Sequence, residues 1–379
     1  MSDDPIELLA DLVRIESVNP DLVPGGAGEG AIADYCAGWF AARGFEVHRV
    51  EEHPGRPSIV GIARGSGGGR SLMFNGHYDT VSTASYAGDA LDPVVRDGRL
   101  YGRGAFDMKG GVAAMMVAAD RARRRGLRGD ILVACVADEE HASFGTAEVA
   151  ARFRADAAIV TEPSHLELTV AHRGFVWFDV TVHGRAAHGS RPELGIDAIA
   201  KAGKFLVALE EYDRRLRAAP SHRLLKSGSV HASLIRGGEE ISSYPAECRI
   251  SLERRTIPGE TPQSIAAELQ EIIDRIAASD PDFRATLATG LDRPPFEIAE
   301  TEPIVVTLDR IAAARTGKPV PRRGEPFWTD CAILQGAGTP CVMFGADGAG
   351  AHAASEWVDM ASVGTLTDIL TETAAAFCG

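Results

Sequence analysis

Histidine and acidic residues stand directly after three short apolar runs of the sequence. His77 and Asp79 lie in FNGHYD, Glu139 and Glu140 in ADEEH, and Glu162 in VTEP. Each apolar run has the composition of a buried strand, and α/β proteins place functional side chains at the carboxyl ends of such strands. Imidazole and carboxylate groups are donors that zinc-like divalent ions accept. The three segments therefore predict a metal site.

Two further segments complete this pattern. Asp107 stands among four glycines in GRGAFDMKGG, before a predicted helix, and His352 stands in GAHAASE after a late strand. Two histidines and three carboxylates are too many for one catalytic zinc ion that keeps an open position. They fit two ions that share a bridging aspartate, about 3.5–4 Å apart, which would lower the pKa of a bridging water and polarise a carbonyl. The predicted ligands are His77, Asp107, Glu140, Glu162 and His352.

Two more residues are assigned roles beside these ligands. Glu139 is adjacent to the predicted ligand Glu140, where it could act as the general base. Asp79 is two residues beyond His77 and could orient its imidazole, as metal-bound histidines usually require.

Each segment also has a structural interpretation. A histidine at a strand end is often a satisfied structural residue, and Asp107 could cap the helix that follows. Glu139 and Glu140 could form a solvated acidic turn. The glycines around Asp107 are compatible with a phosphate site, but the sequence has neither GxGxxG nor GK[ST]. The chemical interpretation therefore depends on all five segments together.

Alternating helices and strands must position these residues. The spacing of apolar residues predicts helices over 6–15, 29–43, 108–125, 307–315 and 361–377, and strands over 45–50, 71–75, 129–136, 157–160 and 341–344. This alternation predicts an α/β fold with a mostly parallel sheet that helices cover on both faces.

The pattern changes near Gly174. Strands are predicted over 175–182, 230–235 and 248–254, and helices over 195–212 and 261–278. The block is large enough to be an inserted α+β domain. We therefore predict a discontinuous catalytic domain of residues 1–173 and 292–379, interrupted by an inserted domain of residues 174–291.

Composition excludes several classes of protein. The 379 residues suggest two or three domains at roughly 150 residues each. The hydrophobic fraction of 45% and the charged fraction of 24% are ordinary for globular proteins, which excludes disorder, collagen and coiled coil as the main state. The formal net charge of −14 argues against nucleic acid and anionic membrane surfaces as partners.

The cysteines and the amino terminus predict a cytoplasmic protein. The six cysteines are scattered, form no CxxC pair and suit a reducing compartment. The start MSDDPIELLADLV is acidic and lacks the features of a signal peptide. No stretch approaches the roughly 18 uninterrupted apolar residues of a membrane span.

The combined motifs resemble the M20 family of metallopeptidases and amidohydrolases, in its acetylornithine deacetylase, succinyl-diaminopimelate desuccinylase and carboxypeptidase G2 branch. The matching stretches occur in family order over essentially the whole chain: NGHYDTV, GRGAFDMKGG, ADEEHASFGT, VTEPS, VHGRAAHGSRPELGIDAI, ERRTIPGET, WTDCAILQGAGTPCVMFG and HAASEWV. A chance match of all these blocks at suitable spacing is implausible.

The resemblance implies a role for each residue at the predicted metal site. His77 and Glu162 would hold one ion, Glu140 and His352 the other, and Asp107 would bridge them. Glu139 would be the general base and then the proton donor to the leaving amine, and Asp79 would set the tautomer of His77. Zinc is the expected metal, and cobalt or manganese would accept the same ligands.

The resemblance also gives the inserted domain a role in dimerisation, or as a lid. His188 would stabilise the oxyanion, reaching the active site of a partner subunit. Arg255 would hold the substrate carboxylate, with the neighbouring Arg254 facing the other way along a strand. Ser243 stands where many members bind substrate through an asparagine. A homodimer could form through the strand 175–182 or the helix 195–212.

The expected activity is hydrolysis of the amide of a small N-acyl amino acid, by a metal-bridged hydroxide with Glu139 as base. Glu162, where aminopeptidase-like branches have aspartate, favours deacylases and carboxypeptidases. Ser82, Ser243 and the loop Gly345–Gly348 depart from the usual family residues near the substrate, so one member's substrate is not transferred. The alternatives are a dipeptidase or carboxypeptidase, and a non-catalytic binding protein on this fold. A nucleotide-dependent oxidoreductase is disfavoured because no dinucleotide fingerprint follows an early strand.

Overall fold

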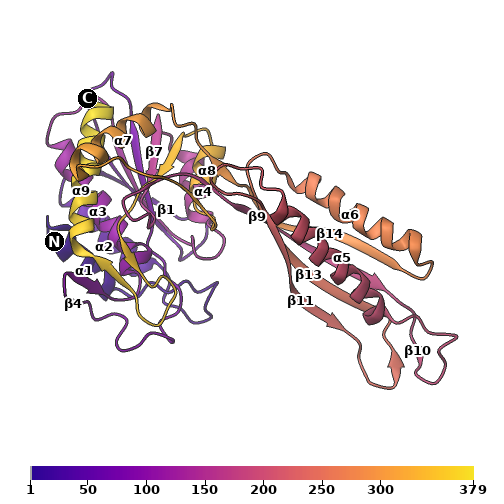
Figure 1. Ribbon diagram of the computed structural model, residues 1–379. Helices are drawn as coiled ribbons and strands as arrows, with labels where there is room; N and C mark the ends of the chain where they lie inside the picture. The colour runs from indigo at the N-terminus through magenta and orange to yellow at the C-terminus, as the bar shows by residue number, and fades with distance from the viewer. Residues whose placement is uncertain (1) are drawn as a thin grey trace. The chain divides into compact units, whose positions relative to one another are not determined.

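The computed structural model describes residues 2–379 and divides the chain into two compact units (Figure 1). The first unit runs to Val170 and also takes up Ile298–Arg323 and Thr329–Gly379, and the second consists of Ala171–Glu297 and Gly324–Trp328. The predicted inserted domain of residues 174–291 does not include Gly324–Trp328. This segment groups with the second unit because Arg173 N donates to Glu325 O and Trp328 Nε1 donates to Pro294 O. The catalytic and dimerisation roles of the units stay predictions.

A mixed sheet forms the centre of the first unit. Its strands, in spatial order, are β1 (Glu46–Val50), β2 (Ser58–Ala63), β6 (Ile131–Val136), β3 (Leu72–His77), β7 (Ala157–Val160) and β17 (Cys341–Met343). β17 pairs next with β8 (Leu168–His172), which also pairs with the short strands β15 (Phe296–Glu297) and β16 (Arg322–Glu325). The predicted α/β class is confirmed.

Parallel pairing is restricted to the middle of this sheet. β6, β3, β7 and β17 run parallel, whereas β1 with β2, β2 with β6, and β17 with β8 are antiparallel. The sheet is thus more mixed than predicted, because β2, which the sequence analysis did not include, enters next to β6 in the opposite direction. β2, β3, β6 and β7 are buried along their whole length, as expected for strands covered on both faces.

Helices surround this sheet. They are α1 (Pro5–Arg14), α2 (Gly30–Ala41), α3 (Gly110–Arg123), α4 (Phe144–Arg152), α7 (Pro303–Thr316), α8 (Cys331–Gly336) and α9 (Met360–Cys378). α3 packs against α1 and α9, and α2 and α4 pack against β2. α1 lies one residue from the predicted range 6–15; the Asp4 side chain caps it by accepting from Ile6 N, and Pro5 stands in the first turn. α4 was not predicted; its Ser143 N-cap forms no side-chain capping bond.

A small antiparallel sheet in the first unit carries the His352 loop. Its order is β18 (Gly348–Ala349), β19 (Trp357–Asp359), β5 (Arg99–Tyr101) and β4 (Val94–Arg96). The loop between β18 and β19 contains His352, and the chain leaving β5 leads into the helical turn η1 (Ala105–Lys109). The sheet therefore anchors two of the five segments singled out in the sequence.

The second unit is an antiparallel sheet with two helices. The strand order is β11 (Ser229–Gly237), β13 (Glu247–Thr256), β9 (Gly174–His183) and β14 (Arg284–Arg293). One side of β9 is buried, and it shares a hydrophobic core with α5 (Ala198–Ala218) and α6 (Pro262–Ser279), so both helices cover the same face (Figure 1). α6 starts with a capping box between Thr261 and Ser264.

The interior position of β9 corrects one expectation about the homodimer. β9 is paired with β13 on one side and β14 on the other, so its backbone groups are already used. The segment 175–182 therefore cannot extend the sheet into a second subunit. β11 and β14 are the edge strands of this sheet, and an intermolecular ladder requires an edge.

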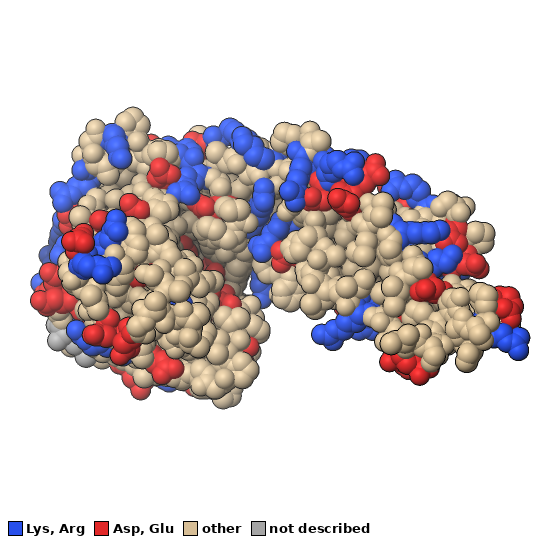
Figure 2. Space-filling model, turned by 60° about the horizontal axis from the view of Figure 1, so that its bottom comes forward, with Lys and Arg blue, Asp and Glu red and all other residues tan. Residues whose placement is uncertain are grey.

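Charge is dispersed over the face of the first unit that Figure 2 shows. On the face shown in Figure 2, acidic and basic side chains lie intermingled over the first unit. Among residues 2–379, no helix is long and apolar enough to cross a membrane. All six cysteines are free and buried, as expected for core residues.

Candidate metal centre

The parallel strands bring three of the predicted segments to one edge of the sheet. His77 is the last residue of β3 and is in register with Val136, the last residue of β6. Asn75 of β3 is in register with Val160, the last residue of β7. Glu139 and Glu140 follow β6, and Glu162 follows β7. The structure thus places these side chains beside His77, as the sequence predicted.

Asp107 lies between the two histidines. Its Oδ1 is 3.2 Å from His77 Nε2, and its Oδ2 is 3.3 Å from His352 Nε2. Glu140 Oε2 is 3.0 Å from the same His352 nitrogen. One carboxylate whose two oxygens face different histidines has the geometry of a bridging ligand.

Glu162 and Glu139 lie on the His77 side. Glu162 Oε1 is 3.4 Å from His77 Nε2, and Glu139 Oε2 is 4.0 Å from it. His77 forms two groups of potential ligands, one with Glu139 and Glu162 and one with Asp107 and Glu140, each with donor atoms within 4.8 Å of one another. All five predicted ligands and Glu139 therefore meet in one place.

The electrostatics show how closely the acidic groups are packed. Burial and the charge of Asp107 raise the pKa of Glu140 to about 7. Burial, together with the same aspartate, raises the pKa of Glu162 to about 7. Burial and the charge of Glu162 raise the pKa of Glu139 well above its ordinary value. These carboxylates would be ionised together at neutral pH only with cations beside them.

The pKa of His352 is also raised, because its partners are acidic. Hydrogen bonds to Asp107 and Glu140 raise the pKa of His352 to about 10. Although burial opposes it, hydrogen bonds from His352 and His77 hold the pKa of Asp107 below its ordinary value. Two imidazoles and a set of buried carboxylates form the nitrogen and oxygen donor set of a site for two divalent ions. The residues present therefore fit such a pair of ions.

The metal-free protein should lose stability as pH rises. A carboxyl group whose pKa is raised by folding gives its stabilisation below its unfolded pKa and loses it as pH passes the folded pKa. For Glu140 and Glu162 this window runs from 4.5 to about 7, and the raised pKa of His352 acts in the same direction. In thermal unfolding scans, the gain in Tm on adding zinc to chelated protein should be larger near about pH 8 than near about pH 5. A gain in Tm that becomes smaller as the pH rises would contradict the raised pKa values of these closely packed carboxylates.

Asp79 connects the histidine to the Glu139–Glu140 turn. Its carbonyl oxygen is 3.0 Å from His77 Nδ1 and its Oδ1 is 3.5 Å from the same atom. Its carboxylate also accepts from Glu139 N at 3.1 Å and Glu140 N at 3.2 Å. Asn19 Nδ2 donates to Asp79 Oδ2 at 2.8 Å, a contact that the sequence analysis did not find. Asp79 thus holds both the imidazole and the acidic pair.

The glycines around Asp107 have conformational and packing reasons. Gly104 has φ +78°, which favours glycine, and a Cβ on Gly111 would lie 2.2 Å from Thr161 O. The amino terminus of α3 therefore approaches the end of β7 closely. These contacts account for the glycines without a phosphate. The peptide bond between Asp107 and Met108 is cis.

The other predicted site residues lie in the second unit. His188 in β10 (Ala187–His188) stands opposite Ser243 in β12 (Ser243–Tyr244), so the structure brings these two together. His188 is exposed, with Nδ1 2.8 Å from Ser190 Oγ, and Ser243 donates to Glu240 Oε1 at 2.6 Å. The roles of His188 and Ser243 stay predictions.

The two neighbouring arginines of β13 face opposite sides of the sheet. Arg254 is fully buried and pairs with Glu260 at 2.5 Å. Arg255 is part-exposed; its Nε donates to Glu253 Oε1 at 2.7 Å, and its guanidinium lies 5.2 Å from the Phe175 ring centre. Arg254 is therefore structural, and the role of Arg255 in holding a substrate carboxylate stays a prediction.

Replacing Arg254 with methionine should destabilise the protein by about 3 kcal/mol, because the change leaves the Glu260 carboxylate without its cationic partner. Thermal or denaturant unfolding measures this loss. Arg249→Met is the matched control, because Arg249 is exposed on the same strand and its ion pair with Glu247 is long, at 3.8 Å. This variant should change stability by less than about 0.5 kcal/mol. Equal stability of the two variants would contradict a structural role for Arg254.

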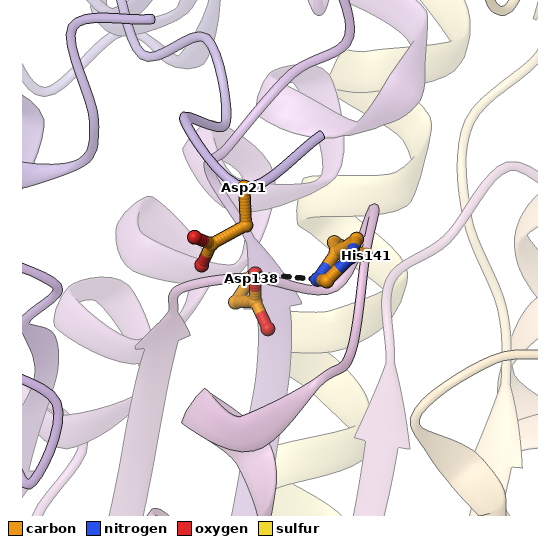
Figure 3. A group of neighbouring side chains, drawn as sticks. All are labelled: Asp21, Asp138 and His141. Carbon is orange, nitrogen blue, oxygen red and sulfur yellow. Dashed lines mark ion pairs between the residues drawn. The ribbon is translucent and has the colours of Figure 1, made fainter. Parts of the chain in front are cut away.

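A second acidic cluster lies behind the Glu139–Glu140 turn. Figure 3 shows Asp21, Asp138 and His141, with His141 Nδ1 3.9 Å from Asp138 Oδ1. The buried guanidinium of Arg56 donates to Asp138 Oδ1 at 3.1 Å and also pairs with Asp21 and Glu29. Because this cation already compensates the carboxylates, the cluster supports the turn and is not a cation site.

The family of the chain follows from comparison with known proteins. Residues 73–376 match the model of the peptidase family M20/M25/M40. The chain belongs to this family. An acetylornithine deacetylase from Myxococcus xanthus is 31% identical over 363 residues, which cover 92% of each chain. The predicted resemblance is thus confirmed.

Other M20 relatives carry different names. A Bacillus subtilis N-formyl-4-amino-5-aminomethyl-2-methylpyrimidine deformylase is 28% identical, over 98% of this chain and 94% of its own. A solved Bacillus subtilis structure, described as a dinuclear metal binding peptidase from the M20 family, has a TM-score of 0.77 at 16% identity, over 99% of this chain and 97% of that one. As an M20 member, this chain is a hydrolase that acts on amide bonds. The alternative of a non-catalytic binding protein on this fold is therefore excluded.

Proposed function

We propose that this M20 hydrolase is a deacylase that cleaves the amide of a small N-acyl amino acid, as an acetylornithine deacetylase does. The observation that carries the proposal is Asp107 lying between His77 and His352, with Glu139 beside them. The names of the two relatives add support, because a deacetylase and a deformylase both remove a small acyl group from an amine.

Two divalent ions would be held by the residues of the first unit. His77, Glu162 and Asp107 would hold one, and Asp107, Glu140 and His352 the other. Zinc suits these nitrogen and oxygen donors, and cobalt or manganese would accept them too. When bound, the ions would supply Lewis acidity that polarises an amide carbonyl and lowers the pKa of water. The description of an M20 relative as a dinuclear metal binding peptidase supports a pair of ions.

Glu139 would move the proton. Its carboxylate is buried with other acids, and bound cations would offset the repulsion that raises its pKa. It would take a proton from the attacking water at one carboxylate oxygen and deliver it to the nitrogen of the leaving amine. Asp79 would hold His77 and the Glu139 backbone in place during both steps.

Residues of the second unit would bind the substrate. Arg255 would hold the carboxylate, because its guanidinium keeps N–H donors beyond the Nε that Glu253 engages. His188 would donate to the developing oxyanion, and its neighbour Ser243 would contact the substrate.

A homodimer through the second unit would place His188 in trans. β11 is an edge strand with Leu234 and Ile235 exposed, and α5 exposes Val207. Unpaired edge groups and exposed aliphatic side chains favour a two-fold interface there. Light scattering after gel filtration measures the mass, and a monomer at working concentration would exclude a role in trans.

The free cysteines support a cytoplasmic location.

A dipeptidase or carboxypeptidase of the same family is the second candidate. It would cleave the same kind of bond with the same groups, and a peptidase is among the solved M20 structures that the chain resembles.

Amine release from a panel of substrates separates these functions. The panel contains acetyl-ornithine, succinyl-diaminopimelate, acetyl-glutamate, acetyl-methionine, formyl amino acids and dipeptides, with zinc-loaded protein. Turnover of an N-acyl amino acid that a chelator abolishes supports the proposal. Cleavage of dipeptides alone would replace it with the peptidase function.

A further inference from the structure

One buried carboxylate outside the ligand set holds the backbone around Asp107. Glu356 is only 1% exposed. Its Oε1 accepts from Phe106 N at 2.9 Å and Asp107 N at 3.0 Å, and its Oε2 accepts from Gly104 N at 3.0 Å. Three main-chain N–H groups of the Asp107 turn thus end on one side chain.

Arg103 supplies the fourth donor and joins two other loops. It is as buried as Glu356, and its Nη1 donates to Glu356 Oε2 at 2.8 Å. Its Nη2 donates to Ala353 O at 3.0 Å, next to His352, and its Nε donates to Ser82 O at 3.2 Å. The pair therefore links the Asp107 turn to the loop that carries His352.

Direct contacts between the segment that contains Ser82 and the loop that carries His352 anchor this loop further. Ala87 N donates to Ala354 O at 2.7 Å, and Tyr86 Oη donates to Glu356 O at 3.3 Å. The Arg103 guanidinium lies 5.4 Å from the centre of the Tyr86 ring. His352 itself is half exposed, so its position depends on the anchoring of its loop.

We propose that Glu356 and Arg103 are positioning residues that fix Asp107 and His352 at the separation needed to hold a metal ion between them. The inference rests on the metal-ligand roles in the proposed function, but not on the identity of the substrate. It predicts an unequal effect: the ion held by Asp107, Glu140 and His352 depends on both loops, whereas the ion held by His77 and Glu162 depends on the pair only through Asp107.

The hydrogen-bond pattern identifies the informative substitution. Both Glu356 oxygens accept from two donors, so the amide nitrogen of Glu356→Gln would face N–H groups wherever it pointed. Arg103→Lys keeps the charge opposite Glu356 but lacks the guanidinium fork that reaches Ser82 and Ala353. The lysine variant tests the loop connection if the glutamine variant does not fold.

Asp120→Asn is the matched control. Asp120 is a buried carboxylate of α3 with arginine partners, Arg123 and Arg124, and it lies ten residues beyond Gly110, or about 15 Å along the helix. This substitution also removes a buried charge from an ion pair, but it does not touch the ligand segments.

Cobalt titration of chelated protein, followed by calorimetry and visible absorption below the unfolding temperature of every variant, tests the proposal. Wild type should bind two ions. Glu356→Gln and Arg103→Lys should bind one of the two ions, the one that Asp107, Glu140 and His352 would hold, about 10–100-fold less tightly. The cobalt spectrum should change too, as expected when groups that orient ligands are changed. Asp120→Asn should lose Tm but keep wild-type affinities.

The inference is wrong if Glu356→Gln keeps wild-type affinities and a wild-type spectrum; if Glu356→Gln does not fold, the same result in Arg103→Lys overturns it. It is also wrong if Asp120→Asn loses as much affinity for cobalt as these variants do. A failure of the metal-ligand assignment looks different, because Asp107→Asn would then bind two ions as wild type does. A failure of the deacylase proposal leaves these titrations unchanged, since no substrate is present.

Discussion

Replacing Glu139 with glutamine should lower kcat by about 10²–10⁴-fold, while the protein still binds its two ions. Glutamine keeps the size of the side chain but cannot accept the proton of the attacking water. Glu139 is also farther from His77 Nε2, at 4.0 Å, than Asp107 or Glu162, so its loss should disturb the ligands little. Steady-state kinetics with the best substrate of the panel, together with metal analysis, measures both quantities.

Glu148→Gln is the control for this variant. Glu148 is a largely buried glutamate of α4 that pairs with His53 at 2.6 Å, away from the ligand cluster. It should keep near-normal kcat. A Glu139→Gln enzyme with near-normal kcat would show that another group moves the proton, and one that lost its metal would make Glu139 a ligand.

Replacing Asp107 with asparagine should abolish the binding of at least one ion and reduce kcat/KM by more than about 10³-fold. Each Asp107 oxygen faces a different histidine, and an amide supplies only one oxygen and no charge for the two positions. Metal content after dialysis and kcat/KM with zinc restored in excess measure the two effects.

The Asp120→Asn protein serves again as the reference, since it carries the same substitution at a buried aspartate of the helix that follows. Full metal content and activity in Asp107→Asn would contradict the bridging role. If the metal content and the activity of Asp107→Asn fell only in proportion to a lowered Tm, Asp107 would have a role in stability and not in metal binding.

The predicted ligands could be found in the sequence because they stand at strand ends or within recognisable motifs. His77, Glu140 and Glu162 follow apolar runs that form parallel strands, and parallel neighbours end at one edge of a sheet. Asp107 and His352 were found from their motifs, one glycine-rich and one beside a late strand. The limits of α6 followed from apolar spacing to within one residue at each end.

Pairing between strands was less readable. Three strands of the second unit, β9, β11 and β13, were predicted, but β14 was missed, as were the interior place of β9 and the edge place of β11. β2 was missed beside β6, although it sets the mixed character of the main sheet. Strand order is fixed by contacts between distant segments, and these leave no periodic pattern in the chain.

The amino-acid sequence alone was thus enough to indicate the family, the fold class and the chemical groups available to the site. The tertiary structure alone decided that Arg254 is buried while Arg255 is part-exposed, and that His188 stands opposite Ser243. It also decided that Glu356 holds the Asp107 turn. A buried charged residue needs partners, and those of Glu356 lie about 250 positions away along the chain. Only folding brings such partners within hydrogen-bond distance, so no local pattern of residue types could have shown them.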